Sequence, residues 1–147
     1  NGSKIWLFGI PDRIDKANDN TLVIVDYKTY NTAGMARDSR SGLNVQLAIE
    51  GWIAGEGRYP GIEARPVSEL VYYSLTGKQG KAGDIQLVTD NFPELLQDTK
   101  DRITTLLQKY YTDNEPFLSV PDEGNEPDER FQHYAHLARI AEWRQDV

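Results

Sequence analysis

Two aspartates and a lysine are the residues of this 147-residue sequence whose types and spacing suggest chemistry. Asp26 and Lys28 stand two apart in residues 21–28, TLVIVDYK, whose β-branched residues predict a largely buried strand. Residues two apart on a strand leave the same face, with Cα atoms roughly 6–7 Å apart. The ordinary alternative for such a pair is a solvated sheet edge. Asp26 interrupts an apolar run, and such a run is not expected at a solvated edge. Asp26 is therefore a candidate functional residue.

Asp12 belongs to the preceding segment, residues 4–16, which we predict to be a strand that forms a hairpin with the strand at 21–28. With a connecting loop of odd length, Asp12 lies opposite Asp26, and their Cβ atoms are about 4.5–5.5 Å apart. The same register turns Arg13 and Asp15 to the opposite face. An even-length loop separates the two acids. In the odd register, the apolar residues on the acids' face are Ile10, Ile14, Leu22 and Ile24.

Two carboxylates at this separation repel each other by roughly 3 kcal/mol at an effective dielectric constant of about 20. A fold that keeps them together either raises one pKa or binds a cation. Oxygen ligands with room for water suit Mg²⁺ or Mn²⁺. Such an ion orients and acidifies water and neutralises a phosphate, while the ammonium of Lys28 would stabilise developing negative charge. The constellation indicates metal-dependent chemistry on a phosphate ester.

The rest of the sequence predicts a mixed α/β or α+β domain. A helix predicted over 43–55 places Gln46 and Glu50 on one side, one turn apart, where they could face the two acids. The other predicted elements are a polar loop at 30–42, strands at 67–75 and 84–88, a helix that begins near Pro93, and a helix at about 130–144.

Composition limits the class of protein. The chain has no cysteine, which excludes disulfides, thiolate zinc sites and an iron–sulfur cluster within it. Its 16 basic and 23 acidic residues give a net charge of −7, which argues against tight DNA binding by this chain alone. A partner could supply the basic track. An acidic loop at 121–129 is interpreted as a solvated linker, and no apolar run is long enough to cross a membrane.

Three stretches within residues 5–54, GIPDRID, VIVDYKT and VQLAIEGW, together resemble the core of a PD-(D/E)XK nuclease of the RecB-like branch. The resemblance implies a restriction-endonuclease-like mixed sheet flanked by helices, and DNA hydrolysis that depends on Mg²⁺ or Mn²⁺. It implies that Asp12 and Asp26 are metal ligands, together with the backbone carbonyl of Tyr27. It makes Lys28 the catalytic lysine.

The same resemblance assigns further residues around this centre. Gln46 would orient the lysine, a water molecule or the DNA. The family often has Tyr four residues later, where this chain has Glu50. We interpret Glu50 as a carboxylate that supports the ligands from behind, with an acid on the helix surface as the alternative. Arg13, Arg37 and Arg40 are placed near the DNA path, with solvated surface charge as the alternative for each.

Two later stretches, VSELVYYSLTG (67–77) and YAHLARIAEW (134–143), resemble the C-terminal end of AddB-type subunits of alphaproteobacterial helicase–nucleases. That likeness implies one nuclease domain over residues 1–147, cut from a longer subunit whose upstream helix adds a His or Glu to the site. It implies a cytoplasmic role in double-strand-break processing and recombinational repair with an AddA-like partner. The alternatives are a catalytically silent scaffold of the same fold, used for complex assembly or DNA binding, and an unrelated metal-binding domain that acts on another phosphate compound.

Overall fold

The computed structural model describes residues 4–80 and 83–117. The chain divides into two units, residues 1–103 and 104–147. The first unit contains a four-stranded sheet in the order β1-β2-β3-β4 and the helices that pack on it. No helix in the described ranges is both long and apolar enough to cross a membrane.

Strands β1 (Arg13–Lys16) and β2 (Leu22–Lys28) form the predicted antiparallel hairpin. Arg13 pairs with Val25 and Lys16 with Leu22, so the loop has an odd length and the predicted register is confirmed. Continued by one residue, this register sets Asp12 beside Asp26.

The predicted strand over 4–16 is too long, because only Arg13–Lys16 is a strand and residues 4–12 form no regular element. Pro11 is the residue that would next pair with Tyr27, and proline has no N–H to give to the ladder. The Tyr27 N–H, which a continued ladder would pair with a backbone carbonyl, donates to the Asp12 carboxylate at 2.9 Å. Ile10, expected on the acids' face, is consequently 85 % exposed.

The predicted loop over 30–42 contains a helix, α1 (Ala33–Arg40), so that prediction is wrong over eight residues. The helix fully buries only two small side chains, Ala36 and Ser39, and Met35 packs against the core while partly exposed. Most of its residues are polar or small, and Gly34 lowers the helix propensity, so this segment has the composition of a loop.

Helix α2 (Gln46–Gly55) begins three residues later than predicted and lies in the crossover between β2 and β3. It packs against both of these strands through Leu47, Ala48 and Ala54. Gly51 lets α2 approach α3 closely, because a Cβ there would lie 2.8 Å from the Phe92 ring.

Strand β3 (Val67–Ser74) is parallel to β2, and β4 (Asp84–Thr89) is antiparallel to β3, so both later strands are confirmed. Helix α3 (Phe92–Leu107) confirms the predicted helix near Pro93. In the second unit it passes into a π-helical turn, η1 (Gln108–Thr112). The predicted helix at 130–144 and the acidic loop at 121–129 lie outside the described residues.

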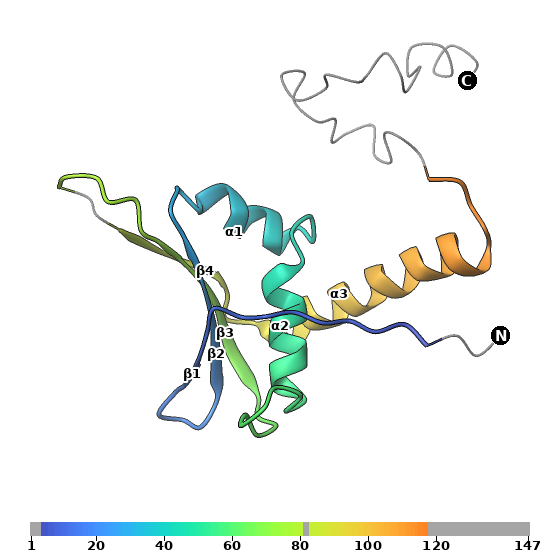
Figure 1. Ribbon diagram of the computed structural model, residues 1–147, viewed down its shortest axis with the longest axis horizontal. Coiled ribbons are helices and arrows are strands. Elements are labelled where there is room, and N and C mark those ends of the chain that lie inside the picture. Colours follow the sequence, from blue (N-terminus) through green and yellow to red (C-terminus); the bar gives the residue numbers. More distant parts are fainter. Residues whose placement is uncertain (1–3, 81–82, 118–147) are drawn as a thin grey trace, which may run out of the picture. The chain divides into compact units, whose positions relative to one another are not determined.

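The core of the first unit lies on one face of the sheet, under α1, α2 and the start of α3 (Figure 1). Leu22 and Ile24 of β2 alternate into this core with Asp26, so the acid occupies a core position at the end of an apolar row. The predicted mixed α/β architecture is confirmed, and it places the chemically interesting strand between two neighbours and beneath α2.

Candidate active site

Asp26 is the centre of the site and is only 2 % exposed. The ammonium of Lys28, two residues further along β2, donates a 2.9 Å hydrogen bond to Asp26 Oδ1. The same nitrogen lies 2.7 Å from Oδ2, which has no hydrogen-bond partner of its own. Burial opposes the charge on Lys28, but the hydrogen bond to Asp26 and the negative charge of Asp26 outweigh it, so the pKa of Lys28 is raised.

Helix α2 adds an amide to this pair. Gln46 Nε2 donates to Asp26 Oδ1 at 2.8 Å and to Glu50 Oε1 at 3.2 Å. One amide nitrogen therefore joins a carboxylate on the central strand to a carboxylate one helical turn away. With both N–H groups used, the Gln46 carbonyl oxygen is the atom left to accept from water or substrate.

Three residues that the sequence did not single out hold the start of α2 in place. Asn44 Oδ1 accepts from the Gln46 N–H, and Asn44 Nδ2 donates to Tyr72 Oη, both at 3.2 Å. Ser39 Oγ lies 3.2 Å from the same hydroxyl. Tyr72 is fully buried and pairs with Asp26 across β2 and β3, so its hydroxyl ties α1 and the start of α2 to the strand beside the acid.

Asp12 lies immediately before β1, in the register position beside Asp26. Its carboxylate accepts the Tyr27 N–H, so the side chain crosses to the backbone of β2 at the residue between Asp26 and Lys28. The Asp12 carboxylate therefore lies at the stretch of β2 that carries Asp26 and Lys28.

Glu50 is a second buried acid, 3 % exposed, and its Oε2 has no hydrogen-bond partner. Burial raises its pKa, and the charges of Asp26 and Asp12 act in the same direction against the Gln46 hydrogen bond and Lys28. Gly9 packs on it so closely that a Cβ would lie 3.0 Å from Glu50 Cγ. Burial, with the charge of Glu50, raises the pKa of nearby Tyr59 to about 12.

The three arginines named as DNA contacts do not join this centre. Arg13 is on the opposite face of the hairpin, where it pairs with Asp15 and donates to Tyr27 Oη at 3.0 Å. Arg37 is exposed on α1 beside Asp38. Arg40 donates to the carbonyl of Leu87 at 3.2 Å, which ties α1 to β4.

With this geometry established, one comparison with known proteins decides the family. The family model of the PD-(D/E)XK nuclease superfamily matches residues 2–143 of the 147. The chain belongs to the PD-(D/E)XK nuclease superfamily. No curated protein and no solved structure matched it.

Membership of this superfamily fits the predicted restriction-endonuclease-like fold, a mixed four-stranded sheet flanked by helices. PD-(D/E)XK proteins are generally metal-dependent nucleases, so a DNA-binding nuclease domain is the function that the family suggests.

The donor atoms present suit the metal that such a nuclease requires. Glu50 Oε2 is a buried acceptor without a hydrogen-bond partner, Asp26 Oδ2 is paired with the Lys28 ammonium, and carboxylates are ligands that Mg²⁺ and Mn²⁺ prefer. In residues 4–80 and 83–117 no three His, Cys, Asp or Glu side chains are already gathered as a metal site. The ligand set of Asp12 and Asp26 with the Tyr27 carbonyl therefore stays a prediction.

Proposed function

We propose that this chain is a nuclease domain that hydrolyses DNA phosphodiester bonds with Mg²⁺ or Mn²⁺. The observation that carries the proposal is a buried aspartate, Asp26, in contact with both Lys28 and Gln46. Asp12, Asp26 and the Tyr27 carbonyl would hold the metal. When bound, that ion supplies an acidified water molecule and neutralises charge on the phosphate.

Three side chains of the chain would have the other roles in the reaction. The Lys28 ammonium would supply a positive charge for the developing phosphorane. Gln46 is fixed by two carboxylates, which directs its carbonyl oxygen toward water or substrate. Glu50 serves as a positioning residue, because it touches the site only through Gln46.

We further propose that the domain works in an AddAB-type helicase–nuclease, in the cytoplasm, in the processing of double-strand breaks for recombinational repair. The likeness of residues 67–77 and 134–143 to AddB-type subunits supports this context. The net charge of −7 also favours a partner, since an AddA-like subunit would provide the positive surface that the chain lacks.

One observation favours a second candidate, a catalytically silent scaffold of the same fold. The Lys28 ammonium lies within 2.9 Å of both Asp26 oxygens, which is where a metal ion would have to bind. A domain that kept this ion pair permanently would have no place for the cation.

Cleavage of single-stranded and duplex DNA with Mg²⁺ or Mn²⁺ tests the proposal. We expect Lys28→Gln to lower the rate by about 10²–10³-fold, as for loss of one charge-stabilising donor, while the exposed Lys16→Gln leaves it unchanged. In parallel, calorimetry should detect Mn²⁺ binding that Asp12→Asn weakens. Equal cleavage by the two lysine variants, or metal binding indifferent to Asp12→Asn, would contradict the nuclease proposal and leave the scaffold.

A further inference from the structure

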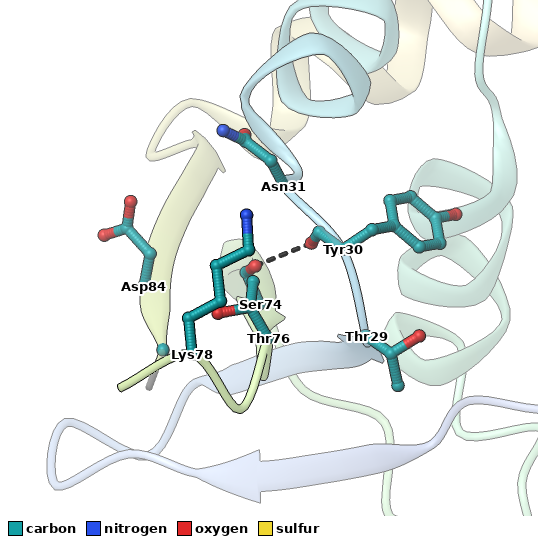
Figure 2. A pocket seen from close by; sticks show the side chains of 8 residues that line it. Thr29, Tyr30, Asn31, Ser74, Thr76, Lys78 and Asp84 are labelled. Carbon is teal, nitrogen blue, oxygen red and sulfur yellow. Dashed lines mark hydrogen bonds between the residues drawn. The ribbon is translucent and has the colours of Figure 1, made fainter. Parts of the chain in front are cut away.

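A pocket of about 270 Å³ opens where the parallel strands β2 and β3 end (Figure 2). Ligands of open α/β sheets bind outside the carboxyl ends of such strands. The pocket's walls come from three segments that follow β2, end β3 and lead into β4. The lining residues are Thr29, Tyr30, Asn31, Ser74, Thr76, Lys78, Gly83 and Asp84.

This pocket adjoins the end of β2 that carries Lys28. Thr29 follows Lys28 in the chain, and the Leu75 N–H donates to the Lys28 carbonyl at 2.7 Å. Ser74, which pairs with Lys28 across the parallel strands and is 2 % exposed, donates from its hydroxyl to the Tyr30 carbonyl at 2.6 Å. The pocket therefore lies next to the end of the strand that carries Lys28.

The polar groups of the pocket favour an anion. Figure 2 shows the Lys78 ammonium pointing toward Asn31. Within the described ranges, Lys78 has no ion-pair or hydrogen-bond partner. Asn31 Oδ1 accepts from the Ala33 N–H at 2.9 Å, which leaves the amide nitrogen of Asn31 as a donor. Helix α1 begins at Ala33, so the positive end of its dipole lies at the same edge.

One acid, Asp84, also lines the pocket, and its carboxylate is engaged elsewhere. Asp84 Oδ1 accepts from the Ile85 N–H at 3.0 Å, and Oδ2 accepts from Gln86 Nε2 at 3.2 Å. In Figure 2 the Asp84 carboxylate points away from the Lys78 ammonium. Among the residues that the structure describes, Asp84 is therefore hydrogen-bonded along β4 and forms no ion pair with Lys78.

We propose that this pocket is a subsite for the DNA strand beside the scissile bond, and that it takes one backbone phosphate through Lys78 and Asn31. The proposal rests on the nuclease function proposed above and adds a residue that no part of the catalytic centre includes. A lysine–phosphate contact is a sequence-independent contact, so it would position the strand rather than select a base.

The salt dependence of DNA binding tests this subsite. A short fluorescent single-stranded oligodeoxynucleotide is titrated with the full chain across a KCl series in EDTA, where cleavage cannot proceed. Loss of one phosphate contact flattens the slope of log K against log salt by about 0.7. We expect that change for Lys78→Gln, and we expect Lys78→Arg to keep the wild-type slope because it keeps the charge.

Lys16→Gln is the matched control, because it removes the same charge from the exposed far end of the hairpin, where Lys16 pairs with Leu22. If Lys78→Gln and Lys16→Gln give equal slopes while Lys28→Gln abolishes cleavage, the subsite is wrong and the nuclease stands. If Lys78→Gln alone flattens the slope but Lys28→Gln cuts like the wild type, the subsite holds and the nuclease proposal fails.

Discussion

Two acid–base pairs with the same spacing lie on opposite faces of one hairpin. Lys28 and Asp26 are two residues apart on β2, and Arg13 and Asp15 are two apart on β1. In each pair a nitrogen lies 2.7 Å from a carboxylate oxygen. The side chains are 19 % and 2 % exposed in the first pair, but 47 % and 37 % in the second.

The surroundings of the two pairs differ more than their geometry. Asp26 sits under α2, receives a second hydrogen bond from Gln46 and keeps one oxygen without a hydrogen-bond partner. Arg13 takes its second partner, the Tyr27 hydroxyl, at an exposed position. A buried pair is held in a weakly screened environment, whereas water and salt screen an exposed one. Burial and a second donor to the acid, rather than a short distance, therefore distinguish a candidate site from surface charge.

The largest effect should follow from removing the cation of the buried pair. Lys28→Met keeps an apolar stem but leaves the Asp26 carboxylate buried without its counter-charge. We expect the free energy of unfolding to fall by about 3–5 kcal/mol, measured by urea denaturation at neutral pH. The double variant Lys28→Met/Asp26→Asn should recover part of that loss, because the buried charge is then absent.

The exposed pair provides the control for this measurement. Arg13→Met removes the cation at the same spacing from Asp15, and we expect a loss of only about 0.2–1 kcal/mol. Equal losses for the two variants would mean that the two faces of the hairpin do not differ in the way argued above.

The local sequence was sufficient for the centre of this site because its parts lie on short, regular elements. The alternation of Leu22, Ile24 and Asp26 fixes the face of β2, and the odd loop sets Asp12 beside Asp26. The helical period places Gln46 and Glu50 together on α2. The chemical roles of these residues remain predictions.

The features that the sequence did not reveal depend on contacts between distant segments. Tyr72 is a plain core aromatic in the sequence, and only the pairing of β3 with β2 sets its hydroxyl against Asn44. The burial of Glu50 depends on Gly9, which comes from a segment far away in the chain. Pro11 lacks an N–H, which is a reason to begin β1 after it. The apolar residues before Pro11 nevertheless have the pattern of a strand, so the predicted strand was too long.

A smaller effect should follow from removing the amide that distinguishes the buried pair. Gln46→Leu takes a charge-assisted hydrogen bond from Asp26 and another from Glu50, and we expect a loss of about 1.5–3 kcal/mol in urea denaturation. Gln97→Leu is the matched control, since Gln97 donates to Asp101 at the same i, i+4 spacing on the exposed face of α3. There we expect a loss of about 0.2–0.5 kcal/mol. A Gln46 variant as mild as its control would show that the amide contributes nothing to the site's stability.

The smallest effect is a pH dependence that comes from Glu50. Its pKa is raised in the folded chain from an ordinary value of 4.5, so between the two values the folded state binds more protons than the unfolded state. The contribution of Glu50 to stability therefore falls as the pH rises from 4.5 through the folded pKa, and then levels off. Glu50→Gln keeps the Gln46 contact without a titrating group, so its stability advantage over the wild type should grow across that window. Glu56→Gln, at the exposed end of α2 beside Arg58, is the control for replacing an acid by an amide on the same helix. An advantage that shrank with rising pH would mean that Glu50 is stabilised as a charged group, as an exposed acid in an ion pair would be.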